Sequence, residues 1–186
     1  MLNWRPSEPS QYRDVQTIWN YENTDLKKSP EERLQRLWRC SRDNARTPVQ
    51  WSDEPNAGFT TGEPWISVNP NYTWINAAQQ EQDPDSILNF YKKAIALRKS
   101  LPVVRHGTYK EYFHNDREQY VYSRDGICQR LLVICSFTDR PMAVKTPKGF
   151  DLSKAELMLC NYDAPGTLLM PYECRVYLWN KVDDAL

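Results

Sequence analysis

The chain has 186 residues, 40% hydrophobic and 26% charged, which is an ordinary composition for one globular domain or two small ones. Its 24 Lys and Arg residues balance 24 Asp and Glu residues, so no net field attracts it to nucleic acid or to an anionic membrane. The longest apolar run, about Leu131–Cys135, is too short to cross a bilayer. The N-terminal residues MLNWRPSEPS lack the basic and apolar regions of a signal peptide.

The five cysteines are odd in number and widely spaced, without a CxxC pair. With only two histidines to join them, neither a zinc site nor any other metal or cofactor site is expected. Free thiols are typical of a reducing compartment, which predicts a cytoplasmic location. The residues are Cys40, Cys128, Cys135, Cys160 and Cys174.

Two helices are predicted at the start of the chain. The first spans roughly Ser10–Tyr21, where apolar residues recur at helical spacing. The second begins after Ser29, because Pro30 suits the first helical position and Glu32 completes a capping box with Ser29.

The segment Ser41–Tyr72 has little helical or strand periodicity and is predicted to be a long functional loop. Its aromatic residues argue against disorder, because they can bury enough surface to fix the loop. These are Trp51, Phe59, Trp65 and Tyr72.

A third helix is predicted from the cap Asp83 to about Ser100. Short β-branched and aromatic runs follow, and a hairpin with a type I′ turn is expected at Asp125–Gly126. This pattern predicts an α+β chain, with helices and loops over 1–102 and an antiparallel β-sandwich over 103–186. The candidate strands are Thr108–Phe113, Gln119–Ser123, Arg130–Phe137, Met142–Lys145, Glu156–Cys160 and Arg175–Trp179.

Collinear blocks along the chain carry a family resemblance. RDNARTPVQW at Arg42–Trp51 and NAGFTTGEPW at Asn56–Trp65 are the most specific, and YRDVQ at Tyr12–Gln16 and VNPNY at Val68–Tyr72 agree with them. The chain resembles the α-glucosidases of glycoside hydrolase family 13, in the oligo-1,6-glucosidase-like group. The resemblance implies a (β/α)8 barrel followed by a C-terminal antiparallel β domain. Residues 1–102 would then be the loop after barrel strand eight and the last barrel helix, without barrel strands.

The resemblance also implies retaining hydrolysis of short α-1,6- and α-1,4-linked glucosides. The Asp nucleophile, the Glu acid/base and the second Asp of that family are expected upstream of Met1, so no catalytic residue is assigned in this chain. We therefore expect the chain to be inactive alone, with a missing barrel segment as a possible partner.

Two substrate-binding residues carry over from the family. Arg42 corresponds to the arginine that contacts the non-reducing glucose and pairs with an upstream Asp; the alternative is that it only braces the loop, as expected for Asp43 and Arg46. Gln16 stands where many relatives carry Glu beside the second sugar; a solvated helix residue is the alternative.

Two further hypotheses remain open. In one of them, the chain is a stand-alone β module that binds carbohydrate or a protein. In the other, it is a non-functional gene remnant. A binding module requires an exposed aromatic platform on its sheet. In a remnant, Tyr91, Leu97 and the loop Ser41–Tyr72, called the aromatic loop below, would lie exposed.

Overall fold

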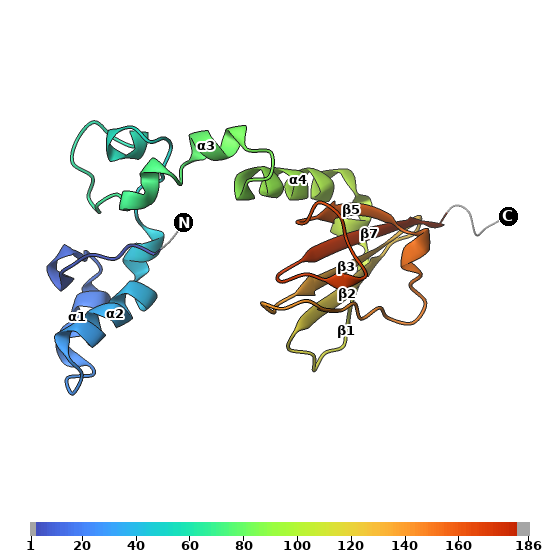
Figure 1. The fold of residues 1–186 in the computed structure, drawn as a ribbon, viewed down its shortest axis with the longest axis horizontal. Coiled ribbons are helices and arrows are strands. Elements are labelled where there is room, and N and C mark those ends of the chain that lie inside the picture. Colours follow the sequence, from blue (N-terminus) through green and yellow to red (C-terminus); the bar gives the residue numbers. More distant parts are fainter. Residues whose placement is uncertain (1–2, 182–186) are drawn as a thin grey trace. The chain divides into compact units, whose positions relative to one another are not determined.

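The computed structural model describes residues 3–181 and combines helices with antiparallel sheet (Figure 1). This mixed class confirms the general α+β prediction. The chain divides into two compact units, Met1–Asn89 and Phe90–Leu186. That division lies before the predicted boundary at 102, and the assignment of 1–102 to the end of a barrel stays a prediction.

The first unit is helical, and its longest helices are α1 (Val15–Asn23) and α2 (Pro30–Cys40). The predicted capping box of α2 is confirmed, with Ser29 and Glu32 each bonded to the other's backbone N–H. The first helix begins later than predicted, because Asp14 accepts a hydrogen bond from Thr17 N and so caps α1. The remaining helical elements are η1 (Pro9–Gln11), η2 (Arg42–Ala45), η3 (Pro55–Gly58), η4 (Pro70–Thr73) and α3 (Ala77–Gln82).

The core of this unit lies around α1 and α2. Its buried residues are Trp4, Tyr12, Leu37 and Ile66. The first two precede α1, Leu37 lies in α2, and Ile66 lies in the aromatic loop. Trp4 and Tyr12 meet edge to face, with ring centroids 5.4 Å apart.

The aromatic loop is held by backbone contacts more than by its aromatic rings. Trp51, Phe59 and Trp65 are exposed, so the prediction that these rings fix the loop by burial is wrong for them, whereas Tyr72 is half-buried. Instead the loop turns through Asn56 and Ala57, both at positive φ, and Trp51 N and Ser52 N donate to Ala57 O at 2.9 and 3.1 Å. Hydrogen bonds satisfy the backbone here without a large apolar core.

The second unit begins within α4 (Ile87–Ser100) and continues through the short α5 (Pro102–His106). The helix predicted to begin at Asp83 instead begins at Ile87. Asp83 is the C-cap of α3, and its side chain accepts a hydrogen bond from Asp85 N in the turn before α4. Helices α3 and α5 were not predicted from the sequence. No residue of α4 is fully buried.

Five strands form one antiparallel sheet in the order β1-β2-β3-β7-β5 (Figure 1). The short strands β4 and β6 pair separately. All six predicted strands are present, and β6 was missed because it is only two residues long. The β2–β3 hairpin is confirmed, but its type I′ turn is wrong, because neither Asp125 nor Gly126 has positive φ. The strands are β1 (Thr108–Tyr112), β2 (Gln119–Asp125), β3 (Gln129–Ser136), β4 (Met142–Ala143), β5 (Glu156–Cys160), β6 (Leu168–Leu169) and β7 (Cys174–Asn180).

Both faces of the large sheet are covered, which explains the nearly continuous apolar run of β3. On one face Leu132 and Ile134 pack with Met142 and Leu169 of the small sheet. On the other face, residues of β3 and β7 pack with Leu101, which precedes α5, and with Val103 of α5. The strand residues are Leu131, Val133, Val176 and Leu178. Leu97 packs partly against this second cluster, so the exposure expected for it in a gene remnant is not found, whereas Tyr91 is exposed.

Within residues 3–181, no helix is long and apolar enough to cross a bilayer. The same residues hold no group of three His, Cys, Asp or Glu side chains arranged to bind a metal ion.

Candidate functional site

The candidate site is built around the buried carboxylate of Asp14 at the start of α1. Its side chain is 4% exposed. One oxygen accepts hydrogen bonds from Thr17 N and Thr17 Oγ1, at 3.0 and 2.7 Å. The other accepts from Arg42 Nη2 at 2.5 Å. These bonds, led by that of Arg42, outweigh burial and lower the pKa of Asp14 to about 2.

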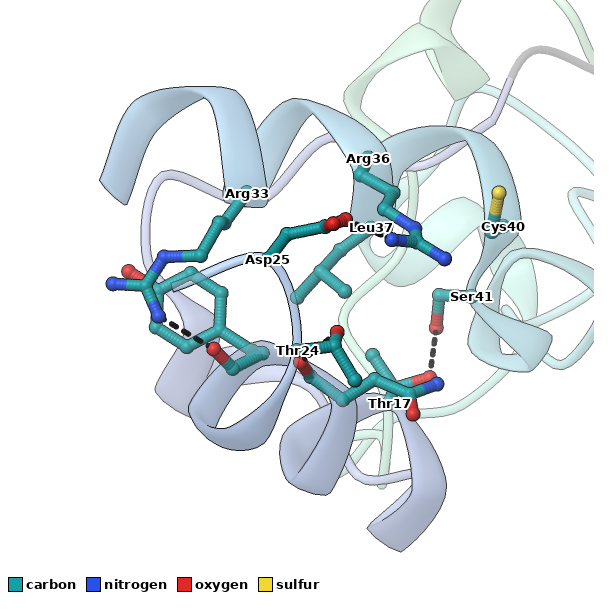
Figure 2. A pocket seen from close by; sticks show the side chains of 10 residues that line it. Thr17, Thr24, Asp25, Arg33, Arg36, Leu37, Cys40 and Ser41 are labelled. Atoms are coloured by element: carbon teal, nitrogen blue, oxygen red, sulfur yellow. Dashed lines mark hydrogen bonds and ion pairs between the residues drawn. The ribbon is translucent and has the colours of Figure 1, made fainter. Parts of the chain in front are cut away.

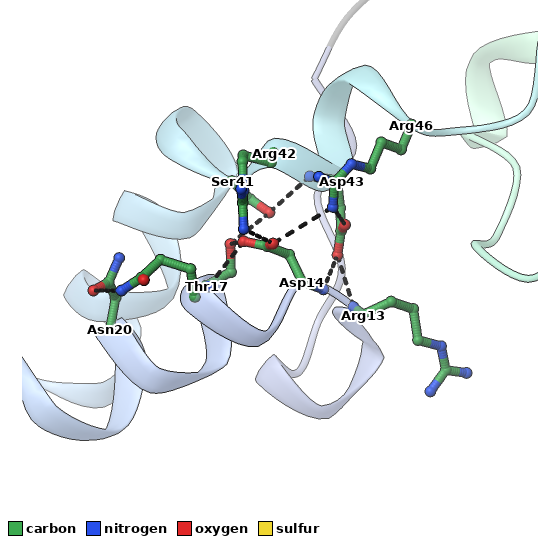
Figure 3. Close-up of polar contacts among 9 residues, drawn as sticks. Arg13, Asp14, Thr17, Asn20, Ser41, Arg42, Asp43 and Arg46 are labelled. Carbon is green, nitrogen blue, oxygen red and sulfur yellow. Dashed lines mark hydrogen bonds and ion pairs between the residues drawn. The ribbon is translucent and has the colours of Figure 1, made fainter.

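Asp43 fastens the start of α1 to η2 (Figure 3). Its fully buried carboxylate accepts hydrogen bonds from Arg13 N and Asp14 N, at 2.7 and 2.9 Å. Arg46 approaches both carboxylates, at 3.4 Å from Asp14 and 3.5 Å from Asp43. Ser41 Oγ caps η2 by accepting from Asp43 N at 3.2 Å. These contacts have the bracing geometry expected for Asp43 and Arg46.

Arg42 differs from its neighbours because it is bound at one end and open at the other. Asp14 holds one guanidinium nitrogen, while 62% of the side chain remains exposed. The hydrogen bond and charge of Asp14 raise the pKa of Arg42. A guanidinium has five N–H donors, so such a group retains donors that can reach hydroxyl oxygens of a ligand.

Asp14 is the residue of this site that the sequence analysis did not single out. It lies 28 positions before Arg42, inside the YRDVQ block. The block was recognised, but its carboxylate was not connected with Arg42, whose partner was expected in the missing upstream segment. The YRDVQ block, as part of the family resemblance, was the signal in the sequence that could have identified Asp14.

Gln16 lies on the exposed surface of α1 and belongs to another hydrogen-bond network. Its Nε2 donates to Asn20 Oδ1 at 3.1 Å, one helical turn further along. Gln16 and Arg42 thus come from neighbouring elements joined through Asp14 and Asp43, but each makes its own contacts. Their roles in sugar binding stay predictions.

A small cavity of about 60 Å³ lies between α1 and α2 (Figure 2). It is large enough for one or two water molecules and too small for a glucose ring. Its walls hold structural contacts: Arg36 pairs with Asp25, and Arg33 lies 4.5 Å over the ring of Tyr21. We therefore assign this cavity to the packing of the two helices.

Comparisons with known proteins agree on one family. The family description "Alpha amylase, catalytic domain" matches residues 9–107, more than half of the chain. Oligo-1,6-glucosidase of Bacillus cereus is 40% identical over 184 residues, covering 95% of this chain and 33% of the relative.

Solved structures give the same picture. Trehalose-6-phosphate hydrolase of Bacillus licheniformis superposes with a TM-score of 0.88 at 38% identity, covering 96% of this chain and 34% of that protein. Trehalulose synthase of Pseudomonas mesoacidophila MX-45 gives a TM-score of 0.85 at 34% identity, covering 95% and 33%. The chain spans about a third of the length of these relatives. The matched residues include Asp14, Gln16 and Arg42, and the resemblance predicted from the motif blocks is confirmed. The chain belongs to the α-amylase family of glycoside hydrolases.

Proposed function

We propose that this chain forms the C-terminal part of an α-glucosidase that hydrolyses short α-1,6- and α-1,4-linked glucosides with retention of configuration. The similarity to oligo-1,6-glucosidase over 95% of the chain supports this substrate class. In this proposal residues 1–102 complete the carboxyl-terminal end of a (β/α)8 barrel, and 103–186 form its β-sandwich domain. The five free thiols are consistent with a cytoplasmic enzyme.

A barrel segment outside this chain would supply the three carboxylates of a retaining mechanism. One forms the glycosyl-enzyme intermediate, one acts as acid and then base, and one stabilises the oxocarbenium-like transition state. The chain is therefore proposed to be inactive alone. Its contribution is to bind and orient the substrate.

The observation that carries this proposal is the exposed guanidinium of Arg42 held by buried Asp14. Because Asp14 already restrains the side chain, Arg42 loses little rotamer freedom when it donates to hydroxyls of the non-reducing glucose. Asp43 keeps Asp14 in place through the backbone N–H groups of Arg13 and Asp14. Gln16 would donate to and accept from hydroxyls of the second sugar without adding charge.

The proposal is tested with the purified chain and with a chimera. In the chimera, this chain replaces the matching third of the Bacillus cereus oligo-1,6-glucosidase. We expect no turnover of an aryl α-glucoside by the chain, and turnover of that compound and of isomaltose by the chimera. Activity of the chain alone, abolished by substitution of one of its own carboxylates, would refute the proposal.

The chimera also tests the site residues. Arg42→Lys should lower kcat/KM by about 10- to 100-fold, because a lysine cannot replace a charge-assisted fork of hydrogen bonds. Arg39→Lys, an exposed arginine at the end of α2, is the matched control and should leave kcat/KM unchanged. Equal kinetics for the two variants would remove Arg42 from the sugar site.

One observation favours the β-module hypothesis as a second candidate. Tyr109 and Tyr120 are exposed on the sheet with their hydroxyls 2.7 Å apart, and both rings lie near Tyr122. Their rings are tilted by 38° and 44° from that of Tyr122, however, which is a poor match to a flat pyranose platform. Oligosaccharide titration of the chain that changes its intrinsic fluorescence, and fails with Tyr120→Ala, would favour this function over the first.

A further inference from the structure

Two cysteines face each other on the neighbouring strands β3 and β7 of the large sheet. Cys135 of β3 is in register with Cys174 of β7, and the two sulfurs lie 3.3 Å apart. The adjacent pair is hydrogen-bonded, with Ser136 N donating to Glu173 O at 2.8 Å. Since hydrogen-bonded and non-hydrogen-bonded pairs alternate, Cys135 and Cys174 occupy a non-hydrogen-bonded position, where Cα atoms are typically about 4.5 Å apart. A disulfide spans that separation.

We propose that Cys135 and Cys174 form a reversible disulfide when the protein meets a hydroperoxide. The Cys135 thiolate attacks one oxygen of the O–O bond, so that its sulfur becomes a sulfenic acid and hydroxide leaves, or an alkoxide when the peroxide is organic. The Cys174 thiol then attacks the sulfenic sulfur and expels water, which completes the S–S bond. Two thiols are oxidised, and the peroxide is reduced to two molecules of water or, for an organic peroxide, to water and an alcohol.

The surroundings of the pair support this order of events. Both side chains are half-buried, so a small oxidant has access while larger ones are hindered. The hydrogen bond between the two sulfurs lowers the pKa of the Cys135 thiol, which favours the thiolate that attacks. The two sulfurs are already in contact at 3.3 Å, so a short approach brings them to the ~2.05 Å of an S–S bond.

Cys160 is the competing partner on the neighbouring strand β5. Its sulfur lies 3.3 Å from Glu173 Oε1. Burial, together with that carboxylate, raises the pKa of the Cys160 thiol and keeps it protonated. In register it faces Arg175, not a cysteine. The bond is therefore assigned to Cys135 and Cys174.

The experiment counts thiols in the full chain. A Cys40→Ser/Cys128→Ser background removes the two exposed thiols and leaves three. After treatment with hydrogen peroxide, the protein is denatured, labelled with N-ethylmaleimide and weighed intact. We expect three labels before oxidation, one after it, and three again after dithiothreitol.

Variants and peptide mapping identify the bonded sulfurs. Cys135→Ser and Cys174→Ser should each abolish the intrachain bond, whereas Cys160→Ser should leave it intact. Peptide mapping of the oxidised Cys40→Ser/Cys128→Ser protein should recover two peptides joined through Cys135 and Cys174. This result does not depend on whether the further cysteine variants fold. Retention of all three labels, a bond that includes Cys160, or bonds only between chains would overturn the proposal.

Discussion

At the level of single residues, Asp14 has the largest number of roles in the candidate site. It caps α1 through Thr17 and holds Arg42, while its own backbone N–H is bound by Asp43. A buried carboxylate is stable only when such partners replace its water. Substitution should therefore affect stability and the orientation of Arg42 together.

The pH dependence of stability should report Asp14. Because its folded pKa is about 2, below the ordinary value of 3.8, ionised Asp14 stabilises the fold above about pH 4, and this contribution is lost as pH falls toward 2. The lowering of the pKa from 3.8 to about 2 corresponds to about 2 kcal/mol, and because solvent screens the largely exposed Arg42 we expect a contribution of about 1–2 kcal/mol. Asp14→Asn should lower the free energy of unfolding by that amount at pH 7 and flatten its decline between about pH 5 and pH 2.

Urea unfolding followed by tryptophan fluorescence measures both effects. Glu22→Gln changes an exposed carboxylate at the other end of α1 and serves as the control. It should follow the wild type at every pH. Parallel curves for Asp14→Asn and wild type would show that Asp14 contributes no pH-dependent stability.

At the level of elements, the sequence predicted helices and strands correctly where the residues that define them are close together in the chain. The Ser29–Pro30–Glu32 cap fixes the start of α2, and alternating or continuous apolar runs located six strands. The start of α1 was missed because Pro9–Gln11 forms a separate 3-10 turn and Asp14 provides the real cap. Helix α5 was missed because it is short and depends on packing against the sheet.

The junction between α5 and β1 gives a prediction of this kind. Gly107 has an ordinary φ of −64°, yet an added Cβ would lie 2.5 Å from Val103 O and 3.2 Å from Arg124 Cβ. Gly107→Ala should therefore destabilise the second unit by overpacking, at a cost of about 1–3 kcal/mol. That corresponds to a decrease in Tm on the order of 5 °C or more.

Thermal unfolding followed by circular dichroism provides the measurement. Gly166→Ala is a matched control, because its Cβ would meet no atom within 4 Å. The control should unfold at the wild-type Tm. If Gly107→Ala did the same, the close approach at this junction would be relaxed at no cost.

At the level of the whole molecule, the chain belongs to a family whose relatives are about three times as long. This difference in length affects how the isolated chain should behave in solution. The α4 residues Ile87, Tyr91 and Ile95 are exposed and follow one another at four-residue spacing, so they form an apolar stripe along one helix face. In the proposed enzyme, a barrel would cover this stripe. In the isolated chain it favours self-association.

Sedimentation velocity over a range of concentrations should show that the isolated chain associates. Tyr91→Lys should shift it toward the monomer by placing a charge in the apolar stripe. Ala96→Lys adds the same charge at another exposed position of α4 and should have a smaller effect. A wild-type chain that stays monomeric throughout would contradict the prediction.

What could be predicted from the amino-acid order alone depends on short-range contacts and on shared motifs. The α2 cap, the strand-rich second half and the family membership all follow from residues close together in the chain or from collinear blocks. The pairing of Arg42 with Asp14 joins residues 28 positions apart, and that of Cys135 with Cys174 joins residues 39 apart. The exposure of Trp51 and Trp65 was likewise unpredictable. Such features depend on which surfaces meet after folding, and local periodicity carries no information about that choice.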